Sequence, residues 1–96
     1  MIEVTITIYF TFRGKLEGSE PGIEVELPDN STVYDAIQTI TELHPDLDGK
    51  ILANSNRPRR FIQIRINKQG IEHLSGLKTK LDDGDDLIIL PKLGGG

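Results

Sequence analysis

The sequence predicts an α+β domain in which a mixed sheet carries one main helix on one face. Apolar and polar residues alternate over three segments, 2–12, 23–27 and 61–67, which is typical of strands with one buried face. Between the second and third segments, apolar residues recur at helical spacing. A continuous aliphatic run at 87–90 is typical of a strand with little exposure to solvent.

The first two strands are expected to form a hairpin. Residues 2–12 alternate without interruption, and the stretch RGKLEGSEPG at 13–22 supplies three glycines and a proline, which favours a long turn. Residues 23–27, IEVEL, then resume the alternation. We therefore expect them to return antiparallel to the first strand.

A helix follows the hairpin. Thr32 and Asp35 have the spacing of a capping box at its start, and Pro45 closes its end. Its apolar positions fall on one face, and they are Val33, Ala36, Ile37, Ile40 and Leu43. Such an amphipathic helix can cover one side of one sheet.

A loop-rich segment joins the helix to the next strand. Residues 46–52 predict a short helical turn whose inward side chains are Leu47, Ile51 and Leu52. Residues 53–60 predict a loop, and its cations are Arg57, Arg59 and Arg60. We interpret this basic cluster as part of a solvated loop, and a docking role is the alternative.

The last part of the domain returns to strands. The alternation at 61–67 places three side chains on one face: Ile62, Ile64 and Ile66. Residues 68–70 turn the chain, and 71–77 form a short irregular or edge element. The stretch LDDGDD at 81–86 predicts a tight turn in which Gly84 takes a positive φ. A cation site is the less favoured interpretation, because no binding-loop frame surrounds the carboxylates.

These elements can be assembled in few ways. A helical crossover that returns to the same sheet is expected to be right-handed, and the run at 87–90 fits best at the sheet's centre, parallel to the first strand. That arrangement is the ubiquitin-like β-grasp. We expect one β-grasp domain over 1–91 and a flexible C-terminal Gly-Gly tail over 92–96.

Composition narrows the classes of function. The 96 residues include no cysteine, which excludes disulfides, thiolate metal sites and a nucleophilic sulfur of the chain's own. The formal charge of -4 argues against general nucleic-acid binding, and against direct DNA binding in particular, because such proteins usually show a basic surface. The N-terminal segment alternates, so it resembles neither a signal peptide nor a membrane span. We expect a soluble, cytoplasmic protein.

The C-terminal segment LIILPKLGGG raises the main functional hypothesis. A terminus without a role is one interpretation, since chain ends tolerate small residues. The other is that the carboxylate of Gly96 is the reacting group. An extended chain from Pro91 to Gly96 spans roughly 15 to 20 Å, and Gly94 and Gly95 would let it thread a narrow enzyme channel. Pro91 has no N–H, so it is expected to end the ladder pairing.

The sequence offers no internal active site. His44 lies at the end of the predicted helix and His73 lies in a turn-rich stretch, and neither has a serine or carboxylate constellation near it in the sequence. We expect no metal and no bound cofactor. The chain is therefore expected to act as the substrate or the subunit of another enzyme.

The end of the chain also resembles a known family. The residues that carry the resemblance are Leu81, Asp83, Gly84 and Asp85, the strand at 87–90, then Pro91, Gly95 and Gly96. An L-x-D-G-D turn, a strand, a proline and a terminal Gly-Gly together resemble the MoaD and ThiS sulfur carriers and the ubiquitin-related modifiers. The resemblance is specific over roughly the last sixteen positions and loose over the rest.

The resemblance implies a function. An E1-like adenylyltransferase would use ATP to adenylate Gly96, which would then become a thiocarboxylate. A second implied partner is the large subunit of molybdopterin synthase, so that the chain would be the sulfur-donating small subunit in molybdenum cofactor biosynthesis. The implied partner-binding residues are Leu90, Pro91, Lys92 and Leu93. The alternation leaves open whether Leu87 with Ile89, or Ile88 with Leu90, faces outward.

Two other hypotheses remain open. A ubiquitin-like protein modifier, or a carrier for tRNA thiolation, would use the same activation but end on lysine amines of target proteins or on RNA. A β-grasp interaction domain with an inert tail would use none of this chemistry.

Overall fold

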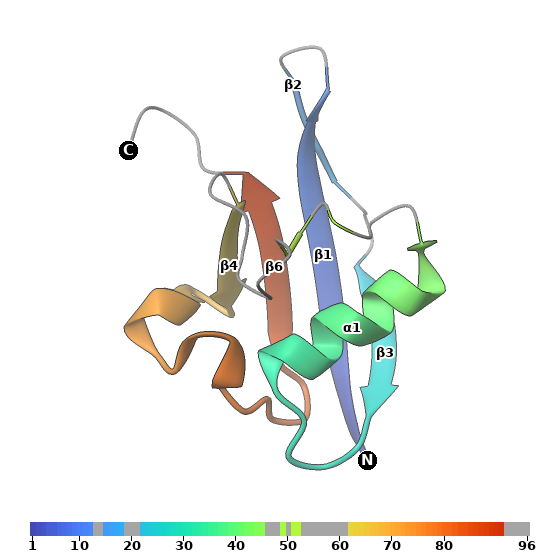
Figure 1. Cartoon of the computed structure of the whole chain (residues 1–96), viewed down its shortest axis with the longest axis vertical. Helices are drawn as coiled ribbons and strands as arrows, with labels where there is room; N and C mark the ends of the chain where they lie inside the picture. The colour runs from blue at the N-terminus through green and yellow to red at the C-terminus, as the bar shows by residue number, and fades with distance from the viewer. Residues whose placement is uncertain (13–14, 19–21, 46–48, 50, 53–61, 92–96) are drawn as a thin grey trace.

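The fold is a sheet with one helix lying across one face (Figure 1). The computed structural model describes residues 1–12, 15–18, 22–45, 49, 51–52 and 62–91. The strands are β1 (Ile2–Phe12), β2 (Lys15–Gly18), β3 (Ile23–Leu27), β4 (Ile62–Ile66), β5 (Gln69–Gly70) and β6 (Asp86–Pro91). The helix is α1 (Val33–Leu43), and two short 3-10 helices, η2 (Ile71–His73) and η3 (Gly76–Lys78), precede β6.

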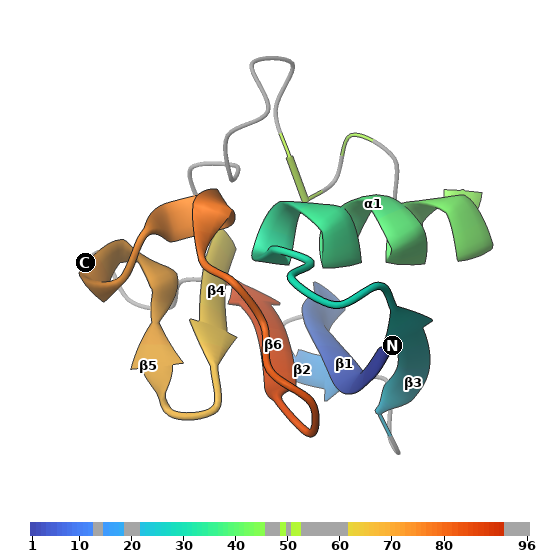
Figure 2. The ribbon, with the colours of Figure 1, turned by 90° about the horizontal axis from the view of Figure 1, so that it is seen from below.

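The strand order places β6 at the centre. The order is β2-β1-β6-β4-β5, and β3 also pairs with β1. Strand β6 runs parallel to β1 and antiparallel to β4, and Figure 2 shows it between these two strands. The predicted central position of the aliphatic run is confirmed, and the arrangement is the expected ubiquitin-like β-grasp.

The core lies between the sheet and α1. The alternation in β1 buries Val4 and Ile6, and β6 buries Leu87 and Ile89 from the neighbouring strand. The helix contributes the residues that its spacing predicted, Val33, Ala36, Ile37 and Ile40. Its start has the expected capping box, in which the Asp35 N–H donates to Thr32 Oγ1 and the Thr32 N–H donates to Asp35 Oδ2.

Leu43 departs from the predicted helical face. It is the last residue of α1 and its side chain is 59% exposed. In Figure 2 the C-terminal end of α1 extends past β3, so the sheet no longer lies beneath that turn.

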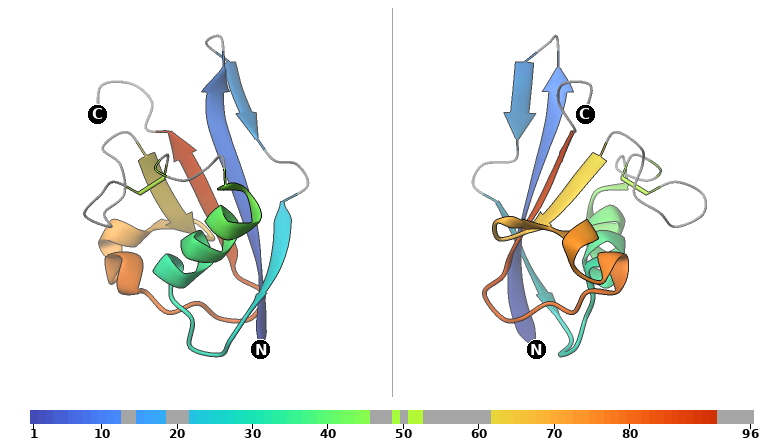
Figure 3. Two further views of the ribbon diagram at one scale, coloured as in Figure 1. Left: turned by 45° about the vertical axis from the view of Figure 1, so that its right-hand side comes forward. Right: turned by 90° about the vertical axis from the view of Figure 1, so that its left-hand side faces the viewer.

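An additional strand corrects the predicted turn at 13–22. Residues Lys15–Gly18 form β2, which pairs antiparallel with the end of β1, from Tyr9 opposite Gly18 to Phe12 opposite Lys15. Strand β1 is long enough to extend beyond β3, so its outer half needs a second partner on the same edge. Figure 3 shows this hairpin projecting from one end of the domain.

Two further details differ from expectation. The predicted turn at 68–70 contains the short strand β5, whereas the segment after it, expected to be irregular or an edge element, forms the short 3-10 helices η2 and η3. Ile51 is buried and Leu52 packs against the core as expected, but neither lies in a helix. Leu47 and the arginine cluster at 57–60 lie outside the described residues.

Among the described residues, no helix combines the length and apolar character that crossing a membrane would require.

Candidate functional site: the central strand and its outer face

The predicted site begins where β6 ends. Pro91 is the last residue of β6 and lies opposite Ile62 of β4, so the described pairing extends as far as the proline. The predicted site residues Lys92, Leu93, Gly94, Gly95 and Gly96 lie outside the described residues. The structure therefore fixes the point from which the tail starts.

The register of β6 decides which aliphatic pair faces outward. Leu87 and Ile89 are 0% and 1% exposed and belong to the core under α1. Side chains alternate across a strand, so Ile88 and Leu90 lie on the opposite face, where both are half-buried. Of the two pairs that the sequence left open, Ile88 and Leu90 form the accessible one.

Polar residues flank these two side chains. Ile88 lies between Thr7 of β1 and Arg65 of β4, and Leu90 lies opposite Gln63 of β4. We call Thr7, Gln63, Arg65, Ile88 and Leu90 the outer patch. This surface combines aliphatic carbon with hydrogen-bonding groups next to the start of the tail, which is the composition of many protein-docking surfaces.

Arg65 is the charged residue among the three of this patch, Thr7, Gln63 and Arg65, that the sequence interpretation did not single out. Its Nη2 makes a long hydrogen bond of 3.4 Å to the Lys68 carbonyl, and its Nε is inaccessible to solvent without a hydrogen-bond partner. The period of two in β4 could have indicated it, because that period places Arg65 on the face opposite Ile64 and Ile66.

The acidic segment before β6 is a turn, as predicted. Gly84 has φ +88, which favours glycine. The carboxylates accept backbone hydrogen bonds: Asp85 Oδ2 from the Asp82 N–H at 2.8 Å, and Asp83 Oδ1 from the Glu3 N–H at 2.8 Å. Within the described residues, no three His, Cys, Asp or Glu side chains gather where they could hold a metal ion.

Asn67 fixes the other side of the same turn. Its Oδ1 accepts the Asp86 N–H at 3.1 Å, and its Nδ2 donates to Asp85 Oδ1 at 3.3 Å. The start of β6 is therefore held by the β4–β5 turn as well as by β1, so the position of the tail's exit follows from both neighbouring strands.

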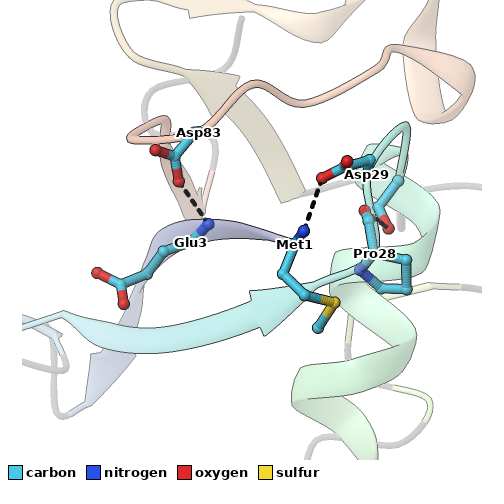
Figure 4. A network of polar contacts seen from close by, with 6 residues as sticks. Met1, Glu3, Pro28, Asp29 and Asp83 are labelled. Carbon is cyan, nitrogen blue, oxygen red and sulfur yellow. Dashed lines mark hydrogen bonds and ion pairs between the residues drawn. The ribbon is translucent and has the colours of Figure 1, made fainter.

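The N-terminus is held at the end of the domain where β6 starts, opposite to the end of β6 from which the tail continues (Figure 1). The Met1 amine forms an ion pair of 2.9 Å with Asp29 (Figure 4). The hydrogen bond and charge of Asp29 raise the pKa of this amine above its usual value of 8.0.

Neither histidine has catalytic surroundings in the part of the chain that the structure describes. His44 is the C-cap of α1 through its backbone N–H, which donates to the Ile40 carbonyl at 2.9 Å. His73 Nε2 is 3.9 Å from Glu72 Oε1, and both side chains are exposed.

Comparison with known proteins shows the family to which this site belongs. The model of the ThiS family matches residues 8–96. The chain is similar to small archaeal modifier protein 3 of Haloferax volcanii, with 25% identity over 95 residues that cover 99% of this chain and 100% of that protein.

Solved structures are similar over nearly the whole length. Small archaeal modifier protein 1 of Methanosarcina acetivorans gives a TM-score of 0.71 at 27% identity, with 100% of this chain and 98% of that chain covered. A putative molybdopterin converting factor subunit 1 from Pyrococcus furiosus gives a TM-score of 0.62 at 20% identity, covering 97% and 100%. The second likeness shows the shared fold.

Proposed function

The chain belongs to the ThiS family of ubiquitin-like sulfur carriers, and on that basis we propose that it is a modifier and sulfur carrier activated at the carboxylate of Gly96. The observation that carries this proposal is that the family match continues to residue 96, through β6, Pro91 and the glycines beyond it.

The proposed activation makes a poor electrophile reactive. A carboxylate oxygen of Gly96 attacks the α-phosphorus of ATP, and pyrophosphate leaves, which gives an acyl-adenylate on an E1-like enzyme. A hydrosulfide ion can then attack the acyl carbon and displace AMP, which leaves the thiocarboxylate. A lysine amine can instead displace AMP, form an isopeptide bond and release a proton. ATP is a substrate of the partner enzyme, and no group of this chain is required to bind it.

The outer patch supports docking during this activation. Ile88 and Leu90 offer partly exposed aliphatic surface on the strand that ends at Pro91. An enzyme that covers the patch would hold the β-grasp domain while the residues after Pro91, roughly 15 to 20 Å when extended, reach its nucleotide.

We favour the modifier among the possible fates. Relatives at 25% and 27% identity are both called small archaeal modifier proteins, which supports an isopeptide product on lysines of other proteins. This reverses the order of the two hypotheses that the terminal motif alone suggested. A carrier for tRNA thiolation remains a variant of the same proposal, because it needs the same activated carboxylate.

A second candidate is the small subunit of molybdopterin synthase. The L-x-D-G-D turn, with Gly84 at φ +88, and the terminal Gly-Gly favour it. In that case the thiocarboxylate would be consumed inside the pocket of a large subunit, and lysines would not be modified.

Pyrophosphate exchange tests the activation. An E1-like enzyme from the same host, given this chain and ATP, should exchange labelled pyrophosphate into ATP. Deleting Gly96, or adding a residue after it, should abolish the exchange while the fold is kept, because the terminal residue adds little to folding. Exchange at the normal rate by the deleted form would exclude the carboxylate as the reacting group.

Tagged protein in host extract then separates the two fates. A modifier should give a ladder of heavier species that survives denaturant and reducing agent and disappears when Gly96 is deleted. A synthase subunit should give a non-covalent complex with one larger protein, and denaturant should dissociate this complex. Intact mass adds a direct readout, since a thiocarboxylate replaces one oxygen by sulfur.

A further inference from the structure

Strand β3 has a free edge on the side away from β1. In the described part of the chain, β3 pairs with β1 alone, and its other edge has no strand beside it (Figure 1). An unpaired edge presents backbone N–H and C=O groups that can pair with another extended chain.

The register shows which residues present these groups. On β1, the Thr5 N–H donates to the Asp85 carbonyl at 3.0 Å, and the Glu3 carbonyl accepts from Gly84 N–H at 2.8 Å, so both residues direct their backbone toward β6. Backbone direction alternates along a strand, so Val4 faces β3 and pairs with Val25. It follows that Glu24 and Glu26 direct their N–H and C=O groups to the free edge.

This edge is also acidic. The side chains of Glu24 and Glu26 are exposed, and Glu26 lies directly opposite Glu3, a cross-strand pair of like charges. No described cation forms an ion pair with any of these three carboxylates. A second copy of this chain, which has the same acidic edge and a net charge of -4, would be repelled from it.

The helix places one exposed apolar side chain near this edge. Helix α1 packs on β3, and its C-terminal end extends past that strand in Figure 2. The last residue of the helix, Leu43, is 59% exposed.

We propose that the free edge of β3 is a second docking site, separate from the outer patch, and that it binds an extended peptide in which Lys or Arg alternates with aliphatic residues. The peptide backbone pairs with Glu24 and Glu26. The basic side chains of the peptide lie on the outer face of the sheet, beside the carboxylates of Glu24 and Glu26. Its aliphatic side chains lie on the opposite face, which carries α1 and its exposed residue Leu43. Alternation is required because successive side chains of an added strand point to opposite faces.

This site goes beyond the proposed function and does not depend on it, because it uses neither the tail nor β6. The edge therefore stays available for binding to other proteins whether or not the carboxylate of Gly96 has reacted.

NMR titration with defined peptides tests the proposal. The probe is a blocked synthetic peptide with the repeat Lys-Val, added to the full-length, isotope-labelled chain. Saturable shifts should centre on the amides of Glu24 and Glu26, and these two amides should gain protection from hydrogen exchange. A Glu-Val repeat should be repelled, and a Lys-Pro repeat should fail because proline lacks the N–H for pairing. Absence of saturable shifts, or shifts centred on Ile88 and Leu90, would overturn the proposal.

Charge reversal supplies the matched variants. The double substitution Glu24→Lys and Glu26→Lys keeps the backbone edge, so it should weaken the Lys-Val peptide at least about fivefold and allow the Glu-Val peptide to bind. Glu72→Lys, which changes an exposed acid on η2, should leave both affinities unchanged. Equal binding of the Lys-Val peptide by the double variant and by the parent would show that the edge charges do not select the ligand, and the proposal would fail.

Discussion

The Asp83 carboxylate accepts the Glu3 N–H at 2.8 Å and thereby joins residues that are 80 positions apart (Figure 4). The neighbouring Gly84 N–H donates to the Glu3 carbonyl, also at 2.8 Å. The turn before β6 therefore satisfies both backbone groups of one residue near the start of β1. This fixes the register of the parallel pair β1 and β6, on which the outward position of Ile88 and Leu90 depends.

Replacement of Asp83 should weaken the connection between the turn before β6 and the start of β1. Asp83→Ala removes the acceptor of one partly solvated hydrogen bond, so we expect a loss of about 1 kcal/mol in the free energy of unfolding, measured by urea denaturation. Asp82→Ala is the matched control, because Asp82 uses its backbone N–H and not its carboxylate in the described hydrogen bonds. Equal losses in the two variants would show that the Asp83 side chain adds nothing beyond turn propensity.

Gly22 should tolerate no side chain. A Cβ at this position would lie 2.4 Å from Thr5 Cγ2 and 2.6 Å from Thr7 Oγ1, on the strand to which β3 pairs. Gly22→Ala should therefore cost about 1 to 3 kcal/mol, measured by thermal or denaturant unfolding. At Gly70 the added Cβ would meet only the end of the Glu72 side chain, which can rotate away, so Gly70→Ala should cost less. A reversed order would contradict this explanation.

The ion pair between Met1 and Asp29 predicts a pH dependence. The pKa of the amine is raised in the folded protein, so its contribution to stability is complete below the unfolded value of 8.0 and is lost as pH rises through the folded value. The difference in unfolding free energy between the parent and Asp29→Asn should be constant near neutral pH and should shrink above pH 8. A Glu42→Gln control, at an exposed site on α1, should show no such trend. A difference that grows at high pH would contradict the assignment.

The outer patch should matter for binding more than for stability. Substituting Ile88→Ser and Leu90→Ser removes half-buried aliphatic surface beside the tail, and we expect binding to the E1-like enzyme to weaken by about 1 to 3 kcal/mol, measured by calorimetry. Leu74→Ser, at a side chain that is 40% exposed between η2 and η3, is the control. Unchanged affinity of the double variant would place the docking surface elsewhere.

The parts of the fold that the sequence predicted correctly have long periodic signals. Strand β1 shows alternation over eleven residues, and β6 shows an uninterrupted aliphatic run. Helix α1 shows apolar residues at helical spacing and a local capping box between Thr32 and Asp35. These patterns are recognisable in the sequence because the core requires apolar side chains at regularly spaced positions of each element.

The parts that were missed form for reasons that are not local. Strand β2 has only four residues, KLEG. They form a strand because the backbone groups at the end of β1 need hydrogen-bond partners. The 3-10 helices η2 and η3 are three residues each, too short for a period to be recognised. Within the site, the outward pair of β6 depends on the pairing register, because an uninterrupted aliphatic run does not show which of its side chains face the core.

The parallel pairing of β1 and β6 has a mechanical consequence. Ile2 lies at the start of β1 and Pro91 at the end of its parallel neighbour β6, so a force that pulls these two residues apart acts along both strands. The bonds between them are then loaded in shear, together, instead of opening one after another as they would at a sheet edge. A protein translocating machine that pulls the tail while the other end is held would meet its greatest resistance at the first step, before any other strand of the sheet yields.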